Sequence, residues 1–255
     1  MLVGGYLPAS RVSTVAALYL VRHGQASFGT HDYDRLSSLG VRQAQWAGQY
    51  LRAIAGRTVR IVSGSLVRHR DTAAEIARCQ AVVRVETVPI RIDERLNELD
   101  LEALIAQLVS SLQDADGTLA TLVSEASTSR SSYQKLVKRV FVHWQTLSEP
   151  MHPLECWSTF SSRVSAALAD LISTRRPGET TIVVTSGGVI AALVQQVLAL
   201  PPQSAYGLLE VQMNCSITCL LHDRQRVSLS SFNESAYLVR AGASDEDPTR
   251  LLTYR

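Results

Sequence analysis

The sequence contains very little lysine, few cysteines and no long apolar run. Only Lys135 and Lys138 among its 25 basic residues are lysines, so the other 23 are arginines. Because arginine is this common, a single arginine beside a motif is weak evidence of function. The longest apolar stretch, around residues 189–200, is interrupted by Gln195 and Gln196, and it falls short of the roughly 18 residues that a membrane span needs.

The cysteine content and the charge narrow the classes of partner. Four irregularly spaced cysteines do not form the pattern of a disulfide framework or a zinc knuckle. No basic residue precedes Arg11 and no signal-peptide core follows, so the reducing cytoplasm is the expected location. A net charge of +2 over 255 residues gives no reason to expect nucleic acid or a membrane as a partner.

Strand-like and helix-like segments alternate in the first third of the chain. Residues 17–21 and 59–63 are short apolar runs typical of buried strands, and residues 37–54 follow a helical period. A helix over residues 68–77 and a third strand over residues 81–88 are expected next. The alternation predicts an α/β fold, a three-layer sandwich in which helices flank a mostly parallel central sheet.

The middle of the chain carries helical periodicity only. Three such segments are separated by polar stretches: residues 101–112, 133–147 and 157–173. This pattern predicts a helical insertion at about residues 99–155. The sheet is expected to resume at residues 180–185, followed by a helix to Leu200 and by late strands over residues 216–221 and 227–232.

A single domain over residues 17–240 therefore carries the sheet and the insertion. Residues 1–16 contain glycines, a proline and serines, and are expected to form an extension that precedes the fold. Residues 241–255 include an acidic run and are expected to form a mobile tail.

Chemically useful side chains follow the first predicted strand, as Arg22, His23 and Gly24. The carboxyl end of a parallel strand is where α/β folds bind ligands. A histidine is partly neutral and nucleophilic near pH 7, and an arginine presents a planar fork that matches phosphate oxygens. Glycine permits a ligand to approach the backbone closely.

Further motifs follow this one in a fixed order. They are Ser63-Gly64-Ser65-Leu66-Val67-Arg68 with Thr72-Ala73 beyond it, Leu96-Asn97-Glu98, Ser186-Gly187-Gly188 and Asn214-Cys215-Ser216. In this order and spacing the chain resembles the histidine phosphatase superfamily, in its phosphoglycerate-mutase-like branch. The resemblance covers most of residues 17–238 and implies that family's fold.

The resemblance also implies a role for individual residues. His23 matches the nucleophile that takes the phosphoryl group as phosphohistidine, and Arg22 and Arg68 match the arginines that clamp its oxygens. Glu98 matches the proton donor to the leaving group. Gly24 is expected to belong to the phosphate pocket, the substrate is expected to be a small phosphorylated molecule, and no metal or other cofactor is implied.

Three residues after the nucleophile are candidate substrate contacts, namely Gln25, Ser27 and Phe28. The other histidines have no metal-ligand spacing and are interpreted as ordinary core or surface residues; they are His31, His69, His143, His152 and His222.

One position departs from the family pattern. The family has a second histidine before the two glycines, where it contacts the phosphoryl group, and this chain has Ser186. Serine keeps a hydroxyl donor, and the glycines still begin a helix whose N-terminus attracts anions. If the imidazole is simply lost, Ser186→His is expected to raise activity on an aryl phosphate.

Three functions remain open from the sequence. The leading one is a metal-independent phosphomonoesterase; a mutase is less favoured, because residues 26–30 lack the mutase pattern of tryptophan and asparagine. The second is a weak or inactive relative that binds a phosphorylated ligand or partner, for which Ser186 is the main support. The third is a serine hydrolase with Ser186, His222 and Asp223, although Val184 stands where the nucleophile elbow needs glycine.

Overall fold

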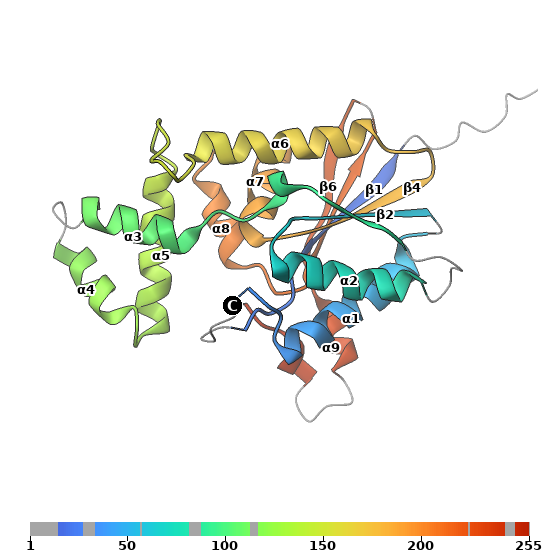
Figure 1. Ribbon diagram of the computed structural model, residues 1–255, viewed down its shortest axis with the longest axis horizontal. Coiled ribbons are helices and arrows are strands. Elements are labelled where there is room, and N and C mark those ends of the chain that lie inside the picture. The colour runs from blue at the N-terminus through green and yellow to red at the C-terminus, as the bar shows by residue number, and fades with distance from the viewer. Residues whose placement is uncertain are drawn as a thin grey trace, which may run out of the picture.

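The computed structural model shows a central sheet with helices on both faces (Figure 1). It describes residues 15–27, 34–56, 58–81, 88–112, 117–223, 225–242 and 248–254. The described strands are β1 (Ala16–Arg22), β2 (Thr58–Ser63), β3 (Ile90–Ile92), β4 (Glu179–Thr185), β5 (Ile217–His222) and β6 (Val227–Glu234). The helices are α1 (Ser38–Ile54), α2 (Val67–Ala81), α3 (Leu101–Leu112), α4 (Gly117–Glu125), α5 (Arg130–Trp144), α6 (Trp157–Ser173), α7 (Gly187–Val197), α8 (Ser204–Glu210) and α9 (Ala236–Ala241), with 3₁₀ turns at Glu94–Leu96 and Pro248–Leu251.

The described strands form a six-stranded sheet in the order β3-β2-β4-β1-β5-β6. The pairs among β1 to β4 are parallel, whereas β5 runs antiparallel to both of its neighbours. The sheet is therefore mostly parallel, and the α/β prediction is confirmed. β1 lies at the centre, so the residues that follow it emerge in the middle of the carboxyl edge.

Alternating side chains of the strands divide the core into two layers. Leu18 and Leu20 of β1 pack with α6 and α7 on one face, while Val21 packs with α1 and α2 on the other. Each of these three side chains is fully buried. This two-sided burial explains why the strands are apolar runs rather than alternating patterns.

The chain between the Glu94–Leu96 turn and α6 is built from helices α3, α4 and α5 (Figure 1). An aromatic cluster joins α5 to α6 and α8. Phe141, Trp144 and Trp157 make edge-on ring contacts with centroids 5.4–5.8 Å apart. Periodicity did not predict α4, a helix of only nine residues whose last two, Ser124 and Glu125, begin a polar, serine-rich stretch.

The expected third strand is wrong in position. Ala81 is the last residue of α2, residues 82–87 lie outside the described ranges, and β3 begins at Ile90. Pro89 has no N–H to donate, so the pairing with β2 starts after it, with Ile90 opposite Ile61.

The expected mobile tail is wrong for residues 248–254. Leu251 is fully buried in the α1–α2 layer of the core. Gln43 of α1 donates hydrogen bonds from Nε2 to the Leu251 carbonyl and to Thr253 Oγ1, both at 2.8 Å. The acidic run dominated the sequence pattern, but the leucine that follows it completes the core. Residues 1–14 of the expected extension and residues 243–247 lie outside the described ranges.

Within the ranges described, no helix combines the length and the apolarity needed to cross a membrane.

Candidate active site

The register of β1 and β4 brings two site candidates to one edge of the sheet. Arg22 pairs with Thr185, so His23 and Ser186 follow side by side at the carboxyl ends of parallel strands. The His23 N–H donates to the Thr185 carbonyl at 2.9 Å. Asn214 Nδ2 donates to the His23 carbonyl at 3.2 Å and fixes the other side of the loop.

The hydrogen bonding of His23 determines which ring nitrogen can react. His23 Nδ1 lies 2.7 Å from the Gly24 carbonyl, and a carbonyl oxygen can only accept. Nδ1 therefore carries the proton, and Nε2 holds a free lone pair. Burial lowers the pKa of His23 well below 6.5, and the nearby positive charges of Arg22 and Arg68 lower it further. His23 is thus a neutral imidazole at pH 7.

The arginines that flank His23 are held by different partners. Arg22 is buried, and its Nη1 donates to the Gln212 carbonyl. Arg68 lies in the first turn of α2, and its Nη1 is 2.5 Å from Asp34 Oδ1. The other oxygen of Asp34 accepts the Val67 N–H at 2.7 Å, so Asp34 fixes both the start of α2 and the guanidinium. Sequence reasoning missed Asp34.

Glu98 reaches the same edge from a different segment of the chain. Its Oε2 accepts the Gly188 N–H at 2.9 Å, and its Oε1 accepts the Leu99 N–H at 3.1 Å. The carboxylate therefore sits at the N-terminus of α7, two residues after Ser186. A side chain at Gly188 would collide with this carboxylate, which explains the second glycine of the motif.

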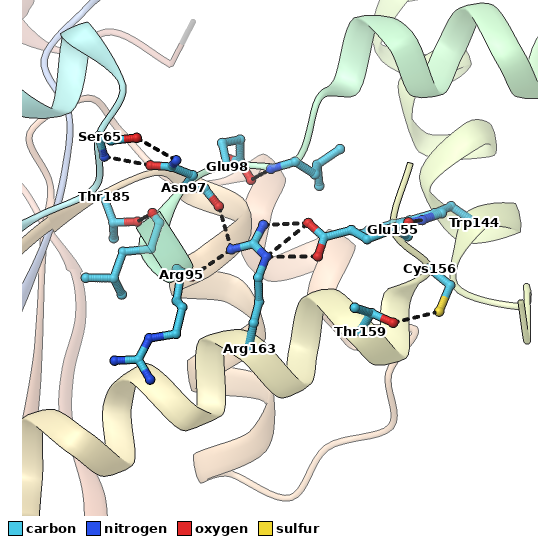
Figure 2. Close-up of polar contacts among 12 residues, drawn as sticks. Ser65, Arg95, Asn97, Glu98, Trp144, Glu155, Cys156, Thr159, Arg163 and Thr185 are labelled. Atoms are coloured by element: carbon cyan, nitrogen blue, oxygen red, sulfur yellow. Dashed lines mark hydrogen bonds and ion pairs between the residues drawn. The ribbon is translucent and has the colours of Figure 1, made fainter. Parts of the chain in front are cut away.

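The backbone that carries Glu98 is held from three sides (Figure 2). Arg163 of α6 donates from Nη1 to the carbonyls of Arg95 and Asn97, at 2.6 and 2.9 Å. The same guanidinium forms an ion pair with Glu155, with Nη2 2.6 Å from Oε1. The Asn97 side chain exchanges hydrogen bonds with Ser65, and Thr185 Oγ1 donates to the Leu96 carbonyl.

A second histidine lies in the site, and sequence reasoning missed it. His69 is fully buried, its ring centroid is 5.7 Å from that of His23, and its Nε2 is 2.5 Å from Ser186 Oγ. Burial, with a smaller contribution from Arg68, lowers its pKa well below 6.5. The available signal was its position directly after Arg68 in a chain that lacks a histidine at position 186.

The residues after His23 mainly shape the loop. The Gly24 N–H donates to Thr72 Oγ1 at 3.0 Å, and a side chain on Gly24 would collide with the backbone of Gly40. Gln25 accepts a hydrogen bond on Oε1 from Ser37 Oγ at 2.9 Å, so its carbonyl end holds the start of α1. The Ser27 N–H donates to the Arg35 carbonyl, and Phe28 lies outside the described residues.

The serine hydrolase hypothesis is wrong. His222 pairs with Ala16, at the amino end of β1, whereas Ser186 follows the carboxyl end of β4. The two side chains therefore lie at opposite edges of the sheet and cannot form a triad.

The buried histidines predict how stability depends on pH. Both folded pKa values lie below the unfolded value of about 6.5, so the unfolded chain binds more protons as the pH falls below 6.5. The free energy of unfolding, measured by denaturant titration, is expected to fall between about pH 6.5 and 5. His69→Gln should flatten this dependence, and a slope equal to that of the wild type would contradict the prediction.

Comparison with known proteins places this chain in a family. A family model described as the histidine phosphatase superfamily (branch 1) matches residues 18–140 and 124–235. The chain belongs to the histidine phosphatase superfamily. No curated protein sequence matches it significantly.

Solved structures share the histidine phosphatase fold of this chain. A mycobacterial glucosyl-3-phosphoglycerate phosphatase in complex with inorganic phosphate is 26% identical, with a TM-score of 0.59 over 87% of this chain and 99% of that one. A phosphoglycerate mutase from Bacillus anthracis is 19% identical, with a TM-score of 0.60 over 89% and 96%. A phosphoserine phosphatase from Entamoeba histolytica is 18% identical, with a TM-score of 0.58 over 88% and 99%.

Within the described part of this superfamily member, no three His, Cys, Asp or Glu side chains are grouped so that they could hold a metal ion.

Proposed function

We propose that the protein is a metal-independent phosphomonoesterase that transfers the phosphoryl group of a small substrate to His23. The observation that carries this proposal is the neutral His23 ring, whose Nδ1 is bound to a carbonyl and whose Nε2 is free to attack. In the first step Nε2 forms the N–P bond while the P–O bond to the leaving group breaks. In the second step water attacks phosphorus, the N–P bond breaks and orthophosphate leaves.

Arg22 and Arg68 supply the positive charge that this reaction needs. Phosphoryl transfer depends mainly on positioning and on stabilising negative charge on the equatorial oxygens. Both guanidiniums lie close enough to His23 to lower its pKa electrostatically. The two charges that add to the effect of burial on His23 are therefore near enough to bind a phosphoryl group on it, and the proposed reaction needs no metal ion.

Glu98 is the proposed proton carrier. It gives its proton to the leaving oxygen in the first step and takes one from the attacking water in the second, so the cycle balances. Its position at the N-terminus of α7, beside Ser186, supports this role.

The four cysteines are all unpaired thiols, in keeping with the proposed cytoplasmic location.

The proposal is tested by hydrolysis of an aryl phosphate in the presence of a metal chelator, together with trapping of the phosphoenzyme. A phosphate that is retained in alkali, lost in acid and mapped to His23 is expected. Activity that disappears with the chelator would contradict the metal-free reaction. A protein that binds phosphate but never forms the phosphoenzyme would instead be the binding relative, which the serine at position 186 favours.

Arg163 offers a test of the proton carrier that leaves the nucleophile untouched. Arg163→Met removes the donors to the Arg95 and Asn97 carbonyls, so the backbone that carries Glu98 is held less firmly. We expect kcat to fall about 10- to 100-fold with little change in KM. Arg95→Met is the matched control, because that side chain pairs with Asp93 and Asp170 instead. Equal effects of the two variants would argue against positioning by Arg163.

A further inference from the structure

The hydroxyl of Ser186 forms a hydrogen bond with His69 and does not cap its own helix, α7. Ser186 is the N-cap residue of α7, yet its side chain makes no capping hydrogen bond. Serine at an N-cap usually accepts a hydrogen bond from a backbone N–H of the first turn. Here Glu98 takes the Gly188 N–H, and Ser186 Oγ lies 2.5 Å from His69 Nε2. Both residues are at least 99% buried, and 117 positions of sequence separate them.

The surroundings of His69 indicate which atom donates in this hydrogen bond. His69 Nδ1 is buried with no hydrogen-bond partner, and it faces the α-carbon of Gly64. A buried N–H without an acceptor is costlier than a buried lone pair without a donor. The tautomer with the proton on Nε2 is therefore favoured, so Nε2 donates to Ser186 Oγ. The Ser186 hydrogen is then available to a third group.

The space for such a group is on the His23 side of the pair. His23 and Ser186 follow adjacent parallel strands, and the rings of His23 and His69 are 5.7 Å apart. Charged groups near the pair include Arg68, on the same helix as His69, and Glu98, across the N-terminus of α7. Arg22 also lies close, with its side chain against Gly187, the residue after Ser186. A phosphoryl group on His23 would lie among them and would accept the Ser186 hydrogen.

We propose that His69 and Ser186 act as a pair that supplies the phosphoryl contact made elsewhere in the family by a histidine at position 186. Ser186 donates its hydroxyl hydrogen to a phosphoryl oxygen. His69 is the positioning residue: its Nε2–H donates to a lone pair of Ser186 Oγ, so the hydroxyl hydrogen is left to point at the phosphoryl group. The imidazole has not been lost from the pocket; it is supplied by α2 instead of by the β4–α7 junction. This inference rests on the proposed function, because it assumes a phosphoryl group at His23.

A double-mutant cycle tests the pair. Because both residues serve one contact, His69→Ala and Ser186→Ala should each lower kcat/KM about 5- to 30-fold, and the double variant should be no worse than either. His69→Gln keeps a neutral donor near the Nε2 position and should restore most of the loss. His222→Gln is the matched control, since His222 is also buried but lies at the other edge of the sheet.

The same cycle also gives an opposite expectation for a histidine at position 186. Ser186→His alone places a second imidazole where His69 Nε2 already is, so it should lower activity. Combined with His69→Ala, it should raise activity above that of His69→Ala alone. This replaces the expectation from the sequence, which assumed that the space was empty.

Binding of inorganic phosphate, measured by calorimetry on the same variants, separates the two proposals. One outcome is a protein that hydrolyses nothing, in which both single variants bind phosphate more weakly and the double variant shows no further loss. That result would support the His69–Ser186 pair and contradict the proposed phosphatase activity. Additive losses, or a His69→Gln variant as impaired as His69→Ala, in an active enzyme would overturn the pair and retain the phosphatase. Thermal melting of each variant identifies any loss that comes from unfolding.

Discussion

Replacing His23 by alanine is expected to abolish phosphomonoesterase activity, with a loss of at least about 10⁴-fold in kcat. The reaction as proposed has no second route, because the N–P bond forms only on His23 Nε2. The remaining arginines would still bind phosphate, so the phosphate affinity should fall much less than kcat. The measurement is the rate of aryl phosphate hydrolysis together with the amount of trapped phosphoenzyme.

The control for this variant is a histidine remote from the site. His152 is exposed and lies within the insertion, so His152→Ala should hydrolyse the substrate at the wild-type rate. If His23→Ala keeps measurable turnover after repeated purification, another group on the protein is the nucleophile. The backbone of residue 23 can still bond to Asn214 and Thr185 when the imidazole is removed. Loss of both activity and phosphate binding would therefore indicate a disturbed loop and not only a missing nucleophile.

Arg68→Ala is expected to have the second largest effect, a loss of about 2–4 kcal/mol of transition-state stabilisation, or roughly 30- to 1,000-fold in kcat/KM. The guanidinium is held by Asp34 at 2.5 Å and is therefore oriented before a substrate arrives. Arg68→Lys should recover only part of the activity, because an ammonium group cannot bind two oxygens in one plane.

Arg70 provides the matched control on the same helix. It is exposed and lies two residues further along α2, so Arg70→Ala changes the charge of the helix without changing the pocket. Arg70→Ala should stay within about twofold of the wild type. Similar losses in the two variants would mean that Arg68 acts only through the net charge of the region. Asp34→Asn should fall between them, because the guanidinium remains but is less firmly held.

The sequence alone was sufficient to predict those helices and strands that are determined by one short stretch of residues. The helix predicted over residues 37–54 is α1, and Ser37 caps it by accepting the Gly40 N–H. Arg22, His23 and Ser186 could be placed together because parallel strands deliver their carboxyl ends to one edge of the sheet. Glu98 reaches the same edge through long-range contacts, such as those of its segment with Arg163 and Ser65, and no sequence pattern encodes these contacts.

Long-range partners explain what the sequence did not show. His69 was interpreted as an ordinary histidine because its partner, Ser186, is 117 residues away. Asp34 was overlooked because its partner is Arg68, from a separate motif. In both cases the residue type was visible, but its function depends on a contact that only the folded chain makes.

The packed segment 248–254 has a consequence for when the protein matures during synthesis. Thr253 Oγ1 donates to Asn214 Oδ1, and Asn214 Nδ2 in turn donates to the His23 carbonyl. The loop that carries His23 leaves the ribosome well before Thr253, which is among the last of the described residues. A nascent chain that stops before residue 248 already contains every strand of the sheet but lacks the support behind this loop. The protein therefore acquires its finished site only after Thr253 has been translated and packed against Asn214.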